Sequence, residues 1–97
     1  MPTQSFDGFD WDEGNWPKCG KHGVSQSEIQ RVFLNGPSVF AHPGHSAAEQ
    51  RLRAIGRNDE GRYLYVSFTI RHQGSEVLIR PVSARYMHQR EIDRYGR

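Results

Sequence analysis

Hydrophobic and polar residues alternate without a break from Tyr63 to Arg71. Because successive side chains of a β-strand point to opposite faces of the sheet, this pattern predicts one strand with two different surfaces. The first surface is apolar and is suited to a core: Leu64, Val66, Phe68 and Ile70. The second carries polar, aromatic and basic side chains: Tyr63, Tyr65, Ser67, Thr69 and Arg71. Such a surface can form the floor of a nucleic-acid site.

Two further long strands are predicted on either side of this one. Residues 49–57 place Leu52, Ala54 and Gly56 on one face, and Glu49, Arg51 and Arg53 on the other. Residues 76–85 form the next strand, in which Pro81 cannot donate a ladder hydrogen bond and predicts a bulge or a partly free edge. Turn residues at 58–61 and 73–75 join the three strands into hairpins. Shorter extended segments are expected at residues 9–12 and 39–40.

Helices are expected before and after these strands. Ser25-Gln26-Ser27-Glu28 has the capping-box pattern of a helix start, and Asn35-Gly36-Pro37 is typical of a helix end. Between them Ile29, Val32 and Phe33 form an apolar stripe at helical spacing. Residues 13–19 favour no more than a helical turn. The spacing of His88, Ile92 and Tyr95 predicts a short C-terminal helix with one buried stripe.

These elements predict an α+β fold in a single domain, residues 1–97. The sheet is expected to be antiparallel and mostly a meander. N-terminal helices should cover the Leu64/Val66/Phe68/Ile70 face and leave the Tyr65/Arg71 face open.

The composition narrows the class of protein. No run approaches the roughly 20 apolar residues that a membrane-spanning helix needs, and the polar start lacks the apolar stretch of a signal peptide. The lone Cys19 is consistent with a cytoplasmic protein. Residues 1–50 have a net charge of −3, whereas residues 51–97 carry ten arginines against five acidic residues. Arginine is suited to bidentate phosphate contacts, so this half favours an anionic partner over a merely solvated charged face.

The predicted open face gathers a set of residues that could cleave RNA without a metal ion. That reaction needs a base for the ribose 2′-hydroxyl, cations for the phosphorane and an acid for the leaving 5′-oxygen. His22 and Glu49 are suitable for proton transfer, and Arg71 and Arg85 for binding the phosphate. Tyr65 or Tyr63 could stack on an unpaired base. A simple cross-strand ion pair between Arg71 and Glu49 is the alternative interpretation.

A metal site is a second possibility. Cys19 and His22, like His42 and His45, are separated by two residues, a spacing that resembles a four-ligand zinc site. Histidines in a loop and a half-buried cysteine explain the same residues without a metal, and this interpretation is favoured. No cofactor is therefore expected.

Several motifs along the chain resemble those of the BrnT-type toxins. The motifs that carry the resemblance are Phe9-Asp-Trp-Asp12, Lys21-His-Gly-Val-Ser25, Glu49 with Arg51, Gly61-Arg62, Thr69-Ile-Arg71, Ile79-Arg-Pro-Val-Ser-Ala-Arg85, and Arg90, Glu91 and Tyr95 in the tail. They span roughly residues 6–95, nearly the whole chain. The Lys-His-Gly-Val-Ser and Ser-Ala-Arg motifs are the more specific ones.

The resemblance implies a RelE-like fold and a ribonuclease toxin of a type II toxin–antitoxin system. Such a toxin arrests translation and is neutralised by a BrnA-type antitoxin, through which alone it reaches DNA. The motif positions fall on Lys21, His22, Glu49, Arg51, Arg71 and Arg85, with catalysis expected of His22, Glu49, Arg71 and Arg85, and RNA binding of Lys21, Arg51 and Tyr65. A non-catalytic module that binds RNA or protein through its arginines is the alternative function.

Overall fold

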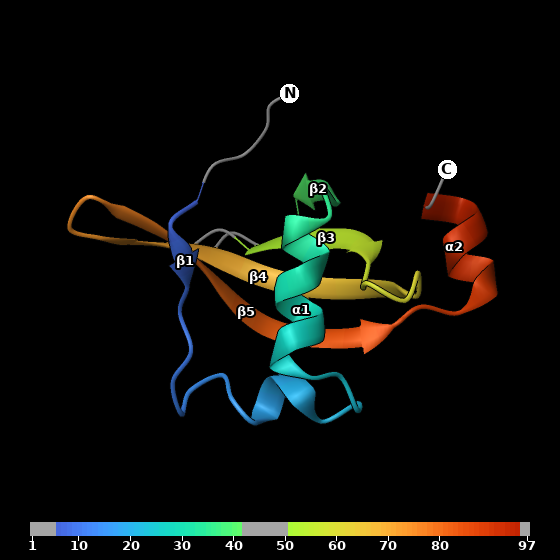
Figure 1. The fold of residues 1–97 in the computed structure, drawn as a ribbon, viewed down its shortest axis with the longest axis horizontal. Coiled ribbons are helices and arrows are strands. Elements are labelled where there is room, and N and C mark those ends of the chain that lie inside the picture. The colour runs from blue at the N-terminus through green and yellow to red at the C-terminus, as the bar shows by residue number, and fades with distance from the viewer. Residues whose placement is uncertain (1–5, 42–50, 96–97) are drawn as a thin grey trace.

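The computed structural model describes residues 6–41 and 51–95 of the 97-residue chain (Figure 1). In chain order its elements are β1 (Gly8–Phe9), a 3₁₀ helix η1 (Lys18–Gly20), α1 (Gln26–Leu34), β2 (Ser38–Ala41), β3 (Arg51–Arg57), β4 (Tyr63–Gln73), β5 (Glu76–Tyr86) and α2 (Gln89–Tyr95). The α+β class and the three long strands are confirmed. The C-terminal ends of β4 and β5 lie two residues and one residue beyond the predicted ends. Neither of the described helices is long or apolar enough to cross a membrane.

The five strands form one mixed sheet in the order β1-β5-β4-β3-β2. Strands β2 to β5 make the expected antiparallel meander. The prediction of a purely antiparallel sheet is wrong, because β1 pairs in parallel with β5 through Gly8 and Leu78, and Phe9 and Ile79. A strand of two residues shows no alternation, so its direction could not be predicted.

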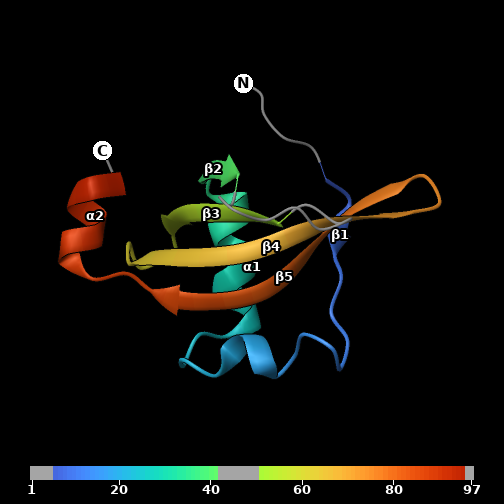
Figure 2. The same ribbon diagram turned by 180° about the vertical axis from the view of Figure 1, so that it is seen from behind.

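Helix α1 lies across one face of the sheet, as Figures 1 and 2 show from opposite sides. Its buried residues Ile29, Val32 and Phe33 share one hydrophobic core with Leu64 and Val66 of β4. The capping box is present: the Glu28 backbone N–H donates to Ser25 Oγ at 3.0 Å, and the Ser25 N–H donates to Glu28 Oε1 at 3.1 Å. The predicted helix is confirmed.

Replacing Ser25 with alanine should lower the free energy of unfolding by about 1 kcal/mol, because the first turn of α1 loses its side-chain acceptor. Chemical denaturation followed by circular dichroism measures the change. Ser27→Ala is the matched control, since Ser27 is exposed on the same turn. Equal losses in the two variants would show that the cap contributes nothing specific.

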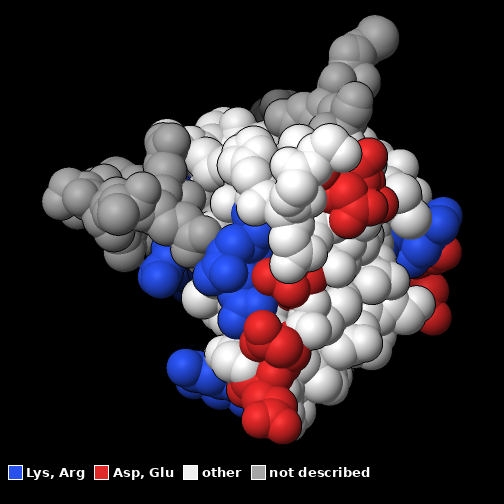
Figure 3. Space-filling view, turned by 90° about the vertical axis from the view of Figure 1, so that its left-hand side faces the viewer, with Lys and Arg blue, Asp and Glu red and all other residues white. Residues whose placement is uncertain are grey.

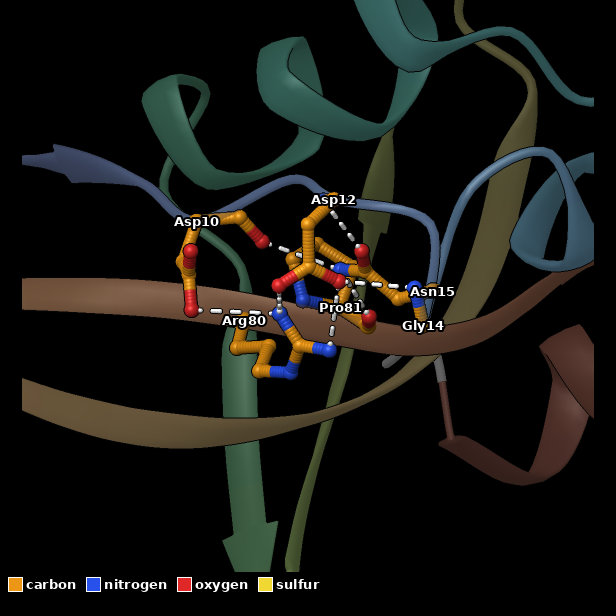
Figure 4. A network of polar contacts seen from close by, with 6 residues as sticks. All are labelled: Asp10, Asp12, Gly14, Asn15, Arg80 and Pro81. Carbon is orange, nitrogen blue, oxygen red and sulfur yellow. Dashed lines mark hydrogen bonds and ion pairs between the residues drawn. The ribbon is translucent and has the colours of Figure 1, made fainter.

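A polar network fixes the segment between β1 and η1 against β5 (Figure 4). The buried Asn15 side chain donates to the carbonyl oxygens of Asp10 and Pro81, both at 2.9 Å, and accepts from the Asp12 N–H at 2.8 Å. Arg80 forms ion pairs with Asp10 and Asp12. These contacts hold a loop without regular structure on the strand that carries Arg85.

Two further expectations concern Pro81 and the tail. A register shift in the β4–β5 pairing confirms the bulge: Ser67 faces Ser83 but Phe68 faces Pro81, so Val82 is the extra residue.

The buried stripe predicted on the tail helix is wrong, because none of the residues of α2 is buried. Helix α2 lies beyond the end of β5 instead of on the core (Figures 1 and 2).

Candidate functional site

The Lys-His-Gly-Val-Ser segment forms the turn between η1 and α1. Gly23 has a φ of +89°, a left-handed conformation that other residues adopt only with strain. Val24 is buried, and Ser25 caps α1. Val24 immediately precedes the cap and Ile29 lies in the second turn, so this buried pair has the spacing of a hydrophobic staple.

Lys21 and His22 are the two residues of this segment that the fold does not use. Both side chains are exposed. The turn that presents them is closed by backbone hydrogen bonds from Lys21 N to Lys18 O and from Gly23 N to Gly20 O. This hydrogen-bonded turn therefore presents an ammonium group and an imidazole to solvent, as is expected of binding residues.

Glu28 connects this turn to the far end of β5. Its Oε2 accepts hydrogen bonds from the Tyr86 hydroxyl at 2.7 Å and from Asn58 Nδ2 at 3.0 Å. Tyr86 follows Arg85 directly, and the side chains of the two residues point to opposite faces of the sheet. The start of α1 and Arg85 thus lie at the same end of the sheet, with β5 between them.

Tyr65 and Arg85 meet on the face of the sheet opposite α1. They are cross-strand partners in the β4–β5 pairing, and the Arg85 guanidinium lies 4.7 Å from the centre of the Tyr65 ring. This is a cation–π contact between two of the predicted site residues. The structure therefore brings together the predicted stacking group and one predicted phosphate ligand.

Arg85 is also held by the C-terminal helix. Its Nη1 and Nη2 donate to Oε1 and Oε2 of Glu91, each at 2.8 Å. This bidentate ion pair lowers the pKa of Glu91 to about 2, and the backbone N–H of His88 contributes further. The side chains of Arg85 and Glu91 keep 39% and 28% of their accessible area, so the pair lies at the surface and is open to solvent.

Arg53 is a third member of this cluster, and sequence patterns did not single it out. Its guanidinium carbon lies 5.4 Å from the Phe40 ring centre and 5.6 Å from that of Tyr95. The pKa of Arg53 is raised, first of all by a hydrogen bond to Tyr65. The signal was present, because Arg53 follows Arg51 on the same face of β3, but its aromatic partners come from β2 and α2. Their proximity could not be predicted without the fold.

Arg51 and Arg71 share this face but lie further along the strands. Arg51 is opposite Thr69, four residues from Tyr65 on β4, and Arg71 is six residues from Tyr65, about 20 Å along the strand. Arg85 meanwhile reaches toward α2, at the end of the sheet away from Arg71. The two predicted phosphate ligands, Arg71 and Arg85, therefore lie toward opposite ends of this face.

The face is less open than predicted. Ser67 and Thr69 of β4 are buried. Arg53 is the cross-strand neighbour of Ser67, and Arg51 and Arg80 are those of Thr69, so long side chains flank the short ones. The prediction of an open face did not take these long cross-strand neighbours into account.

The basic residues do not form one uniform patch. Figure 3 shows acidic side chains beside the basic ones at the end of the molecule where the turn between β4 and β5 lies. Arg80 is paired with Asp10 and Asp12. The remaining predicted catalytic residue, Glu49, lies outside the described residues.

Two hollows lie elsewhere on the described surface. One, of about 520 Å³, is bordered by Arg57, Tyr63 and Tyr95 near the end of the sheet. The other, of about 870 Å³, is mostly apolar and is bordered by Leu34 at the end of α1 and by Leu52 and Ile70 of the sheet. Neither is lined by a predicted catalytic residue, so the candidate site is an open face and not a cavity.

Comparison with known proteins identifies the family of this chain. The family model described as "ribonuclease toxin, BrnT, of type II toxin-antitoxin system" matches residues 11–91. The chain belongs to the BrnT family. No curated protein matches the sequence. Membership indicates a ribonuclease toxin that has RNA as its substrate and an antitoxin as its partner.

Cys19 does not support the zinc alternative in this BrnT chain. Cys19 is 1% exposed and belongs to the hydrophobic core, where burial raises the pKa of its thiol to about 11. Burial therefore disfavours the thiolate that a zinc ion binds. Within residues 6–41 and 51–95, no three His, Cys, Asp or Glu side chains gather as metal ligands. His42 and His45 lie outside the described residues.

Proposed function

We propose that this BrnT chain is a metal-independent endoribonuclease that cleaves RNA at the end of the sheet where Arg85 and the Lys21-His22 turn lie. The arrangement of these residues around the C-terminal end of β5 carries the proposal. Within the described residues β1 pairs with β5 only at Leu78 and Ile79, so no strand pairs with that side of β5 from Val82 onward, although η1 contacts the strand. An RNA strand that passes this edge can contact Arg85 on one face and His22 on the other.

The chemistry assigned to the site is attack of the ribose 2′-hydroxyl on the adjacent phosphate. The oxygen–phosphorus bond to the 2′-oxygen forms, the bond to the 5′-oxygen breaks, and a 2′,3′-cyclic phosphate and a 5′-hydroxyl result. Arg85 stabilises the negative charge of the phosphorane. His22 and Glu49 share proton transfer, one removing the 2′-hydroxyl proton and the other protonating the 5′-oxygen.

The remaining predicted residues bind the rest of the strand. Lys21 lies beside His22 and attracts the backbone on that side. Tyr65 stacks on an unpaired base. Arg51 and Arg71, which lie toward the other end of the same face, contact phosphates further along the RNA.

The proposal extends to partners and to the whole chain. Residues 1–97 act as one RelE-like toxin domain in the cytoplasm. A BrnA-type antitoxin neutralises it and provides its only contact with DNA. Family membership supports an antitoxin; its BrnA type follows from the sequence resemblance.

Purified toxin freed of antitoxin should cleave RNA equally well with and without EDTA, because protein side chains supply every proton-transfer and charge-stabilising group. Gel analysis of a labelled oligoribonucleotide, with end-group mapping of the cyclic phosphate, makes the measurement. An oligonucleotide with a 2′-O-methyl group at the cut site is the control and should stay intact. Cleavage that EDTA abolishes would contradict metal independence, and salt-sensitive binding with no cleavage would indicate a binding module instead.

A further inference from the structure

Helix α2 is attached to the candidate site by side chains more than by a buried surface. It has seven residues, none of them buried. Isolated helices of this length are unstable in water, so its contacts with the sheet must hold it. Glu91, Ile92 and Tyr95 are partly buried, and Glu91 and Tyr95 reach arginines of the RNA-binding face.

The Glu91 carboxylate occupies Arg85 in the way a phosphate would. Each of its two oxygens accepts from one terminal nitrogen of the guanidinium, at 2.8 Å in both cases. Carboxylate and phosphate bind arginine through the same fork of parallel hydrogen bonds. While this pair is closed, Arg85 cannot offer those donors to RNA.

Tyr95 covers the second arginine, Arg53. Its ring contacts Phe40, at 6.3 Å between ring centres, and the Arg53 guanidinium lies against both rings. Arg53 and Arg85 flank the Tyr65 position on neighbouring strands. One short helix therefore engages arginines on both sides of the proposed stacking residue.

We propose that α2 is a latch that covers the RNA-binding face in the free toxin, with Glu91 standing in for an RNA phosphate on Arg85 and Tyr95 covering Arg53. The proposal rests on the proposed function of this face as the RNA site. RNA competes with α2 for the two arginines and displaces it on binding. The apparent affinity for RNA is lowered by the fraction of molecules in which the latch is closed.

The test is a binding measurement with the full chain and a 2′-O-methyl oligoribonucleotide, which the proposed reaction cannot cleave. Glu91→Gln removes the negative charge that pairs with Arg85 but keeps an oxygen that can accept from the His88 N–H at the helix start. A latch closed in most molecules predicts that this variant binds the oligonucleotide about fivefold to tenfold more tightly in fluorescence anisotropy.

Asp93→Asn is the matched control. Asp93 is exposed on the same helix and accepts a hydrogen bond from Gln89, so the variant changes net charge equally without touching Arg85. Its affinity should stay within about twofold of wild type. Unchanged binding by Glu91→Gln, equal gains in both variants, or no measurable binding by any variant would overturn the latch.

Hydrogen exchange supplies a second measurement. Amides of α2 should exchange faster in Glu91→Gln than in wild type, and faster in wild type once the oligonucleotide is bound, while the amides of β4 stay protected. Unchanged exchange of α2 at saturating oligonucleotide would show that RNA does not displace the helix. Failure of the proposed function is a separate result: if Glu91→Gln gains affinity but unmodified RNA stays intact, the latch stands and the nuclease assignment does not.

Discussion

Arg85→Ala should lower the rate of RNA cleavage by about 100-fold to 1,000-fold, the usual cost of losing one donor that stabilises a charged transition state. Expression of this variant should also no longer arrest growth. The side chain lies on the β5 surface and takes no part in the hydrophobic core, so the loss should come from chemistry and not from unfolding. Single-turnover cleavage of a labelled oligoribonucleotide, with a melting curve for each variant, makes the measurement.

Two variants separate charge from geometry. Arg94→Ala removes an equal charge from an exposed position on α2 and should keep nearly full activity. Arg85→Lys keeps the charge but cannot offer the planar fork of donors, so it should recover only part of the rate. Full growth arrest by Arg85→Ala would remove this residue from the site. Full activity in Arg85→Lys would assign it a general electrostatic role.

The strands were easier to predict than the site, because their signal lies in local sequence. Alternation along β4 has one consistent solution, because a shift by one residue would expose Leu64, Val66 and Phe68. The capping box of α1 is equally local, since Ser25 and Glu28 satisfy each other. Position on a face follows from such patterns, and Tyr65 and Arg85 were correctly expected on one side of the sheet.

What the patterns could not supply was where each arginine side chain points. The ten arginines after residue 50 were interpreted as a supply of phosphate ligands. Several are instead committed to partners distant in sequence: Arg80 to Asp10 and Asp12, and Arg53 to Phe40 and Tyr95. Arg85 and Glu91 are only six residues apart, but their pairing depends on how the chain turns after β5. Tertiary contacts of this kind leave no periodic signal.

The tail illustrates the same limit. Ile92 and Tyr95 have the spacing of a buried stripe, but a seven-residue helix at the end of the sheet leaves them only partly buried. The spacing correctly predicted a helix. Its surroundings were set by the length of β5, which carries the chain past the edge of the core.

Asn15→Ala should cost about 3 kcal/mol of folding free energy, which for a domain of this size lowers the melting temperature by about 15 °C. The Asn15 amide is 3% exposed and makes three hydrogen bonds to backbone groups, one of them across 66 residues to Pro81. Alanine leaves two carbonyl oxygens and one N–H without these partners in a place that excludes water. Thermal and urea denaturation measure the loss.

Asn35→Ala is the control, because Asn35 donates to Arg57 O and to Asp59 at the surface, where water can replace its amide. Its loss should be below about 1 kcal/mol. Equal losses at the two positions would contradict the role given to burial.

Asn15→Asp sharpens the prediction through its pH dependence. A carboxylate there would face the carbonyl oxygens of Asp10 and Pro81, and both burial and these dipoles would raise its pKa above the unfolded value. The folded state then binds a proton more tightly than the unfolded chain, so the variant should gain stability relative to wild type as the pH falls through this raised pKa. A loss of stability that does not change with pH would mean that water reaches the buried site. Because this loop leads into η1 and the Lys21-His22 turn, a wet loop would also loosen the proposed acid–base group, and cleavage by Asn15→Asp should recover at low pH together with its stability.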